Sequence, residues 1–323
     1  MVHMDIAVIG GGASGVFAAR ILKAEGHRPF IIEKGKSVGG RLATRRIGEG
    51  KADHGAQFFT VRRPEMQRYV DTWIREGIAS VWFGEEHPRY MSPFGMNQLI
   101  KHAAEELDVI LRERIIRLET DGEKVFLASE DGELYVADAV IATPPVPQTL
   151  ALLEQSALEL PPETTAALAA FTFDPCIVAL IELEEPQRFG PHGLQDSGLP
   201  EGIDKIAAND QKGISSTPVV TVHMTPEWSR SHYEHEDDDV LSRVMELVRP
   251  LLKQDVKTTQ LKRWRFAQAA HTHPKPYMQL PDYPIYLAGD SFLREDDTSG
   301  KTRVESAVLS GISAARALLE KTK

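Results

Sequence analysis

The chain has 323 residues, which suggests about two domains, and its formal net charge of −10 at pH 7 argues against nucleic acid or anionic membranes as partners. A single cysteine excludes an intramolecular disulfide and is typical of a reducing compartment. No uncharged apolar run reaches the roughly 20 residues that a membrane-spanning helix needs. We therefore expect a soluble, cytoplasmic protein, and Met1–His3 ahead of Met4 are either a non-native addition or the product of an alternative start. The sequence does not define its oligomeric state.

The first predicted element is a buried strand over Ile6–Ile9, followed by three glycines at the spacing G-x-G-x-x-G and then by a helical pattern. In such a strand–turn–helix unit the first glycine permits a tight turn and the second lets a pyrophosphate approach the backbone. The third lets the helix pack closely on the strand. The free amides at the helix start favour negative charge. The residues predicted to bind a dinucleotide here are Gly10, Gly12, Ala13, Ser14 and Gly15.

A second strand is expected over Arg28–Ile32, and it ends at Glu33, 18 residues after Gly15. A carboxylate at this place accepts hydrogen bonds from the adenosine ribose of a dinucleotide. It would repel a 2′-phosphate, so NADP is disfavoured at this site, whereas NAD and FAD stay open. We expect Glu33 and its neighbour Lys34 to bind the cofactor. The alternative is that Glu33 is a solvated loop residue.

A second glycine loop, Gly39-Gly40-Arg41-Leu42, follows the ribose carboxylate. Adjacent glycines permit close backbone approach, and a guanidinium pairs with pyrophosphate oxygens in bidentate fashion. The loop resembles that of the flavoprotein group that includes amine oxidases, protoporphyrinogen oxidases and phytoene desaturases. This resemblance implies FAD as the cofactor, with Gly40, Arg41 and Leu42 among its contacts. Cys176 lies within an apolar predicted strand, so we expect a core thiol and non-covalent FAD.

Two stretches further along the chain narrow the resemblance. Asp53–Thr60 reads Asp-His-Gly-Ala-Gln-Phe-Phe-Thr, and Lys262–Gln268 is a predicted strand with Trp264 and Phe266 at alternate positions. With the glycine–arginine loop, they resemble the renalases and their bacterial relatives. The resemblance implies that Gln57 lies beside the flavin ring and borders the substrate pocket, where the two aromatic side chains would stack on a flat substrate. The alternatives are an ordinary turn at Gln57 and a core-filling role for the two aromatic residues.

The carboxy-terminal part continues the pattern with a strand over Ile285–Asp290 and a helix over Thr302–Leu319. In the flavoproteins that it resembles, the aspartate after the strand bonds the ribityl chain, and the helix start faces the flavin N1–C2=O edge. The positive end of the helix stabilises the negative charge of reduced flavin. The chain departs from this pattern at Ser306, where many relatives have glycine, and in a longer loop over residues 294–301. The predicted contacts are Gly289, Asp290, Arg303 and Val304.

The same resemblance implies two more cofactor contacts. A backbone amide near Ile115, within a strand expected over Val109–Leu118, would read the adenine. Thr143 belongs to an Ala-Thr-Pro segment that ends a buried strand and would lie over the dinucleotide. Histidine-rich or acidic stretches at residues 232–239 and 271–273 lack metal ligands at a recognisable spacing, so we expect no metal.

The expected fold class is α/β. A Rossmann-type FAD-binding domain with a parallel sheet, like that of p-hydroxybenzoate hydroxylase, would be joined to an α+β substrate domain built on an antiparallel sheet. We assign residues 1–76, 94–150 and 277–323 to the FAD-binding domain. Residues 77–93 and 151–276 form the substrate domain in this division.

The renalase resemblance implies oxidation of the 2- or 6-dihydro isomers of NAD(P)H, with hydride transfer to flavin N5, O2 as acceptor and H2O2 as product. Hydride loss makes the dihydropyridine ring aromatic, so the protein needs only to position it, and we assign no residue as acid or base. One alternative is an FAD-dependent amine oxidase or desaturase-like dehydrogenase of a small substrate. Another is a non-catalytic flavin or nucleotide sensor.

Overall fold

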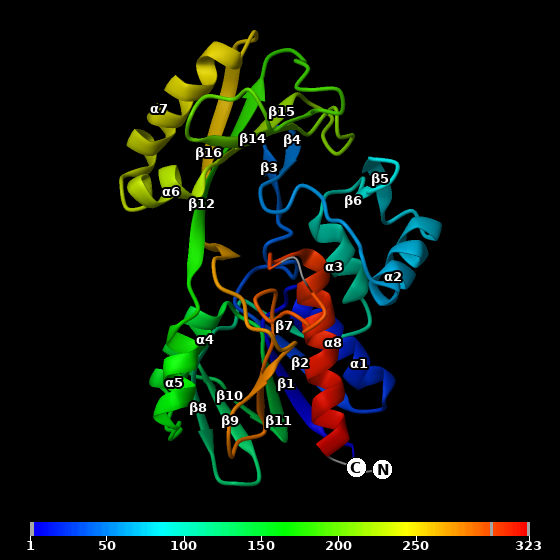
Figure 1. Cartoon of the computed structure of the whole chain (residues 1–323), viewed down its shortest axis with the longest axis vertical. Helices are drawn as coiled ribbons and strands as arrows, with labels where there is room; N and C mark the ends of the chain where they lie inside the picture. Colours follow the sequence, from blue (N-terminus) through cyan, green and yellow to red (C-terminus); the bar gives the residue numbers. More distant parts are fainter. Residues whose placement is uncertain (1–2, 298–299, 322–323) are drawn as a thin grey trace.

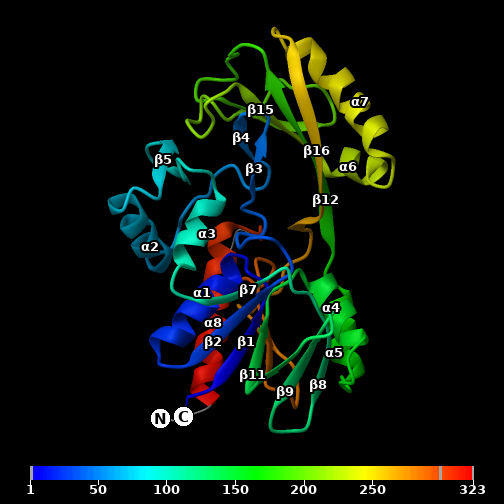
Figure 2. The same cartoon turned by 180° about the vertical axis from the view of Figure 1, so that it is seen from behind.

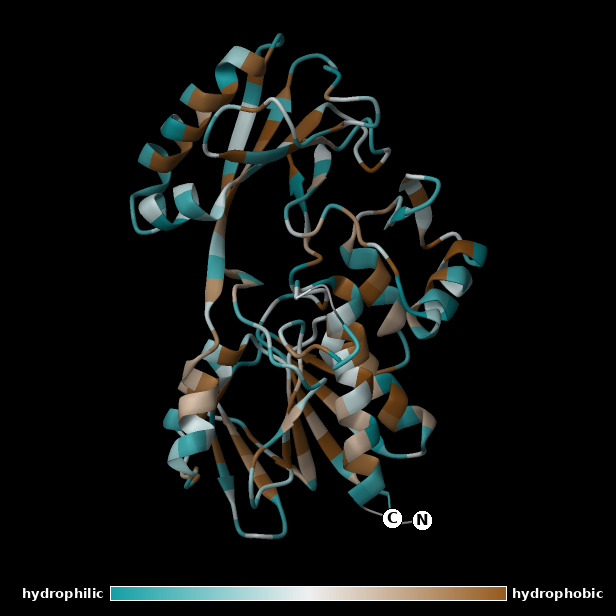
Figure 3. Ribbon diagram, viewed as in Figure 1, coloured by the Kyte–Doolittle hydropathy of each residue, from teal (hydrophilic) through white to brown (hydrophobic). Residues whose placement is uncertain are grey.

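A computed structural model describes residues 3–297 and 300–321, which form two lobes joined by two long strands (Figures 1 and 2). The first lobe contains a six-stranded sheet in the order β17-β18-β11-β1-β2-β7, in which only the β17–β18 pair is antiparallel. Its central strands are almost entirely apolar, because helices cover both faces (Figure 3). The strands are β1 (Asp5–Ile9), β2 (Arg28–Glu33), β7 (Asp108–Leu111), β11 (Ala139–Ala142), β17 (Met278–Gln279) and β18 (Ile285–Leu287).

On one face of this sheet, the first and last helices pack against each other. A Cβ atom at Gly311 would lie 2.0 Å from the carbonyl oxygen of Ser14, so a glycine is needed for this close approach. This face carries α1 (Ala13–Ala24), α2 (Pro64–Arg75), α3 (Asn97–Ala103) and α8 (Val304–Lys321). The other face carries α4 (Val146–Glu154), α5 (Pro162–Ala169) and an antiparallel sheet of β8 (Ile115–Thr120), β9 (Val125–Ser129) and β10 (Leu134–Ala137).

The second lobe is built on a five-stranded antiparallel sheet in the order β13-β14-β15-β12-β16. Alternate residues of β12 point to opposite faces, so one face packs on α6 and α7 while the other packs on the hairpin β3–β4. The strands of the sheet are β12 (Phe173–Leu183), β13 (Leu194–Gln195), β14 (Ile203–Ala208), β15 (Val219–Met224) and β16 (Val256–Ala269). The other elements are β3 (Thr44–Ile47), β4 (Gly50–Asp53), β5 (Ser80–Phe83), β6 (Arg89–Met91), α6 (Pro226–His232), α7 (Asp237–Val248) and a 3₁₀ turn over Arg249–Leu251.

The predicted α/β class, with a parallel sheet in one lobe and an antiparallel sheet in the other, is confirmed. The single strand expected over Val109–Leu118 is wrong. β7 ends at Leu111, Arg112 takes a left-handed φ of 63°, and β8 begins in a different sheet at Ile115. The domain division stays a prediction, and within it the hairpin Thr44–Asp53 shares an apolar core with the five-stranded sheet.

In the described part of the chain, residues 3–297 and 300–321, no helix combines the length and the apolar character needed to cross a bilayer. The His, Cys, Asp and Glu side chains of the same residues form no group of three that could hold a metal ion. Burial raises the pKa of the Cys176 thiol to about 12, which keeps the thiol protonated and unreactive.

Candidate functional site

The glycine turn lies between β1 and α1, as the sequence predicts. Gly10 takes a left-handed φ of 101°, and its amide donates to the carbonyl of Ile32 at 2.9 Å. A Cβ atom at Gly15 would lie 2.0 Å from the Gly10 carbonyl oxygen, whereas one at Gly12 would have no heavy atom within 4 Å. The turn therefore has no room for a side chain at Gly15, where it packs on the strand, but has free space beside Gly12. The first amides of α1 have no acceptor one turn back, so they are available to an anion there.

Glu33 ends β2 beside this turn. Its carboxylate oxygens accept hydrogen bonds from the backbone amides of Gly11 at 2.7 Å and Gly35 at 2.6 Å. An ionised carboxylate has further lone pairs, so these bonds leave acceptor capacity for a ribose hydroxyl. The neighbouring Lys34 ammonium donates to Gln148 Oε1 at 3.0 Å, and burial lowers the pKa of Lys34.

Arg41 connects three distant segments. Its guanidinium forms a bidentate ion pair with Asp290, with N–O distances of 2.5 and 2.9 Å. It also donates to the backbone carbonyls of Ala267 at 3.2 Å and Phe266 at 3.4 Å, at the end of β16. Arg41 was predicted to bind the pyrophosphate and Asp290 the ribityl chain, and the two side chains thus bind each other directly. The amino-terminal loop and the carboxy-terminal strand converge on one place, as expected.

The start of α8 lies beside Asp290. The Ser306 hydroxyl accepts from the Arg303 amide at 2.8 Å, and its oxygen is 2.7 Å from the Arg303 carbonyl and 3.2 Å from that of Asp290. Ser306 therefore folds its side chain back onto the first turn of its own helix. Val304 begins the helix and is half-buried. In the longer loop over 294–301, residues 298–299 lie outside the described residues.

Two of the predicted pocket residues, Gln57 and Trp264, lie on chain segments that contact each other. Gln57 is buried, and its amide nitrogen donates to the carbonyls of Asp53 at 2.7 Å and Gly55 at 3.3 Å. Its Oε1 atom has no partner among the described residues. The Trp264 indole donates to the His54 carbonyl at 2.8 Å and stacks on the His54 ring, with centroids 5.2 Å apart. Trp264 also packs against the hairpin core, so the predicted core role holds as well.

The other predicted contacts are distributed around these groups. Phe266 meets Phe173 edge to face at 5.8 Å. The Thr143 hydroxyl donates to the Ile9 carbonyl at 2.9 Å, beside the glycine turn. Leu42 and Ile115 are buried, and Ile115 pairs with Ser129 in the β8–β9 ladder. Their roles towards a cofactor stay predictions.

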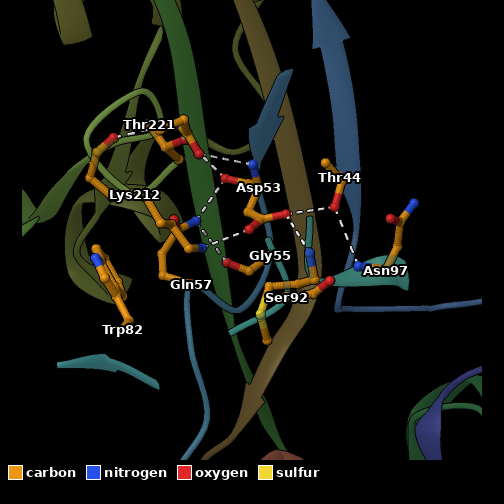
Figure 4. A network of polar contacts seen from close by, with 12 residues as sticks. Thr44, Asp53, Gly55, Gln57, Trp82, Ser92, Asn97, Lys212 and Thr221 are labelled. Carbon is orange, nitrogen blue, oxygen red and sulfur yellow. Dashed lines mark hydrogen bonds and ion pairs between the residues drawn. The ribbon is translucent and has the colours of Figure 1, made fainter. Parts of the chain in front are cut away.

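Asp53, which precedes Gln57 in the chain, forms a fully buried ion pair with Lys212. The sequence did not predict this pair. Lys212 and Asp53 have no exposed side-chain surface, and their charged atoms are 2.6 Å apart. The second Asp53 oxygen accepts from the Thr44 hydroxyl at 2.5 Å and from the Met96 amide at 2.9 Å (Figure 4). Burial lowers the pKa of Lys212, and Asp53 opposes that effect. Lys212 lies in a polar loop, and nothing in its local sequence indicates a buried charge.

Two histidines complete the polar surroundings of Gln57. His223 Nε2 donates to the Gly55 carbonyl at 3.1 Å. Burial, reinforced by nearby lysines, lowers the pKa of His223 to about 3 and that of His54 to about 4. Both rings are therefore neutral at pH 7. Their Nδ1 atoms are buried and have no hydrogen-bond partner within the described residues.

The sequence profile of the flavin-containing amine oxidoreductases matches residues 76–319, which is most of the chain. The chain belongs to this family. The flavin in the family's description agrees with the cofactor that the sequence predicted. The profile of NAD(P)-binding Rossmann-like domains matches residues 8–73, which contain the glycine turn and the arginine loop of this amine oxidoreductase.

Individual relatives match shorter stretches of the chain. L-amino-acid oxidase from Echis ocellatus is 39% identical over 72 residues, which is 22% of this chain and 14% of that protein. Flavin-dependent L-tryptophan oxidase RebO from Lentzea aerocolonigenes is 33% identical over 72 residues, 22% of this chain and 15% of that protein. The matched stretches thus span less than a fifth of these relatives.

A solved structure extends the similarity to the whole fold. The crystal structure of a protein from Exiguobacterium sp. 255-15, provisionally named a protoporphyrinogen oxidase, aligns with a TM-score of 0.72 at 15% sequence identity. The alignment covers 99% of this chain and 100% of that one. At this identity the likeness shows a shared fold.

The residues present fit FAD. Gly12 leaves open space beside the free amides of α1, where a diphosphate is stabilised by the helix dipole. Glu33 retains acceptor capacity for the ribose. The unpartnered Oε1 of Gln57 is a buried acceptor that suits a ring N–H group of the flavin. Gly12, Glu33 and Gln57 would therefore hold the diphosphate, the ribose and the ring edge.

Proposed function

We propose that this amine oxidoreductase oxidises a dihydronicotinamide, the 2- or 6-dihydro isomer of NAD(P)H, as the resemblance to renalases implies. FAD, when bound, takes up the hydride and passes the electrons to O2. The net reaction consumes dihydronicotinamide, O2 and one proton and yields the nicotinamide cation and H2O2. The C–H bond breaks with both electrons leaving as hydride, and the ring becomes aromatic.

The observation that supports this proposal is that each carboxylate around the site is already engaged. Asp53 is paired with Lys212 and Asp290 with Arg41. Glu33 accepts from two backbone amides, and Glu305 accepts from the amides of Arg62 and Arg63. Each of the four thus has a cation or backbone amides as partners, although Glu305 Oε2 accepts no hydrogen bond among the described residues and lies 3.8 Å from the Arg303 guanidinium. A substrate whose oxidation requires no base fits such a site.

In this proposal the chain's own groups bind and orient the substrate. Trp264 is half-buried, stacks on the His54 ring and donates its indole N–H to the His54 carbonyl, so its orientation is fixed and its uncovered part would border a flat ring. The side-chain nitrogen of Gln57 donates to the backbone carbonyls of Asp53 and Gly55. These two bonds fix the direction in which Oε1 points. Stacking on a rigid wall aligns the hydride donor and excludes water.

A second candidate is oxidation of a small amine, which is favoured by the family and by the neutral imidazoles of His54 and His223. An alkylammonium must lose a proton before its α-hydrogen can leave as hydride. The unpartnered Nδ1 of His54 or His223 would have to accept that proton against the burial that lowers the pKa of both rings.

Rapid anaerobic mixing of the FAD-loaded protein with the 2-, 4- and 6-dihydronicotinamide dinucleotides, and separately with amines, tests the proposal. We expect the 2- or 6-dihydro isomer to bleach the flavin absorbance within the mixing experiment, with O2 restoring it and H2O2 formed. Bleaching by amines alone would favour the second candidate. A flavin that no donor reduces would indicate a sensor.

A further inference from the structure

A basic groove of about 510 Å³ lies between the hairpin β3–β4 and helix α3. Four of its nine lining residues are cations and none is acidic, although the whole chain carries a net charge of −10. The cations are Arg45, Arg46, Lys51 and Lys101. Within the described residues, none of these four lies within 4.0 Å of a carboxylate. The groove therefore concentrates uncompensated positive charge on an acidic protein.

The hairpin holds two of these cations in an unfavourable arrangement. Arg46 and Lys51 are directly opposite each other in the antiparallel β3–β4 ladder. Like charges at directly opposed positions destabilise a strand pair, and within the described residues Glu49, in the turn that joins the two strands, forms no ion pair with either side chain. An anion bound between the two side chains would remove this repulsion. The repulsion between Arg46 and Lys51 costs stability when no anion is present. This cost is expected at a site whose function is to bind an anion.

An aromatic ring lies at the same groove. The Phe94 side chain lines it and is 53% exposed, which is unusual for a phenylalanine in a protein whose other large aromatic rings are mostly covered. Asn97, at the start of α3, supplies an amide to the lining. Cations for phosphates, an exposed ring for stacking and an amide for hydrogen bonds together match a nucleotide. The volume is in the usual range for a small-molecule site.

A chain of hydrogen bonds connects the lining of the groove to Gln57. Thr44 lines the groove, and its hydroxyl donates to Asp53, whose carbonyl in turn accepts from Gln57 (Figure 4). The backbone N–H of Asn97 donates to Thr44 Oγ1 at 3.3 Å. Residues that line the groove thus support the segment that we propose to border the substrate ring.

We propose that this groove binds the phosphate-bearing end of a nucleotide substrate, with the diphosphate on Arg46, Lys51 and Lys101 and a base on Phe94. The identity of the reacting ring rests on the function proposed above. The groove assigns the substrate class: a dinucleotide held at two places, its dihydropyridine near Gln57 and its phosphates near the hairpin.

Binding of ADP-ribose to the FAD-loaded protein tests the groove without any reaction. ADP-ribose carries the diphosphate and the base but no nicotinamide, and bound FAD occupies the other nucleotide site. We expect Arg46→Gln and Lys51→Gln each to weaken calorimetric binding about tenfold, because each removes a charge-assisted bond. Binding should also weaken with added salt. Arg243→Gln, an equal charge change on exposed α7, is the matched control and should bind like wild type.

A kinetic comparison separates this inference from the proposed reaction. We expect the groove variants to lower kcat/KM about tenfold for the 6-dihydro dinucleotide and to leave it unchanged for the phosphate-free 6-dihydronicotinamide riboside. Equal losses for both donors, or ADP-ribose binding that matches wild type in both variants, would overturn the groove assignment. If no dihydronicotinamide reduces the flavin, the proposed reaction fails, while ADP-ribose binding still decides the groove.

Discussion

Lys212→Met tests the buried ion pair. Methionine keeps most of the lysine stem but removes the ammonium, so the Asp53 oxygen that faces Lys212 loses its charged partner. Both side chains are fully buried, so water cannot replace that partner without opening the protein interior. Removal of one member of a buried ion pair costs about 3–5 kcal/mol in free energy of unfolding. At about 2–4 °C per kcal/mol for a chain of this class, Tm should fall by about 6–20 °C.

The assay is thermal unfolding of the FAD-loaded protein, followed by circular dichroism. Lys124→Met is the matched control, because Lys124 and Asp138 have the same 2.6 Å separation but the Lys124 side chain is 44% exposed. Its Tm should stay close to that of wild type, since water and salt screen an exposed pair. The double variant Asp53→Asn, Lys212→Met should recover part of the loss, because it leaves no unpaired buried charge. A Lys212→Met variant as stable as the control would refute the reasoning.

Gly12→Val should fold like wild type, because a side chain there points into open space, but should lose FAD in equilibrium dialysis. Gly311→Ala should instead lower the free energy of unfolding by about 1–3 kcal/mol in urea, because its Cβ would meet the Ser14 carbonyl at 2.0 Å. His54 and His223 have lowered pKa values, so the unfolded state binds more protons and stability falls as pH drops below about 6.5. At pH 5 each costs about 2 kcal/mol, and His223→Leu should flatten urea midpoints plotted between pH 7 and 5.

The nucleotide turn could be predicted from sequence because its physics is local. Glycines at fixed spacing after an apolar strand leave few conformations open, and the positive φ of Gly10 and the tight contact at Gly15 follow from that spacing. The same holds for the strand that ends in Gly289-Asp290. In contrast, Arg112 adopts positive φ without being glycine, so the break between β7 and β8 left no signal in the sequence.

The buried charges could not be predicted, because burial is a property of the assembled lobes. Lys212 follows Asp53 by 159 residues and lies in a stretch whose composition indicates a surface loop. His223 occupies an apolar strand, where a histidine on a buried face cannot be told from one on an exposed edge. The basic groove was missed for a related reason: Arg45, Arg46 and Lys51 read as an ordinary charged hairpin until α3 places Lys101 and Phe94 opposite them.

The positions of the two lobes depend on polar connections more than on shared apolar packing. Most of the apolar core of each lobe forms its own clusters, and the five-stranded sheet packs mainly on its own helices and on the hairpin. Arg41 binds Asp290 and the carbonyls at the end of β16, and Asp53, which pairs with Lys212 in the second lobe, accepts from the Met96 amide next to α3 in the first lobe. Buried ion pairs offset their desolvation only at a specific geometry, so they tolerate little sliding. Gln57 donates to the Asp53 carbonyl, and Trp264 precedes by two residues the Phe266 carbonyl that Arg41 binds, so the relative position of Gln57 and Trp264 depends on charges that neither residue carries.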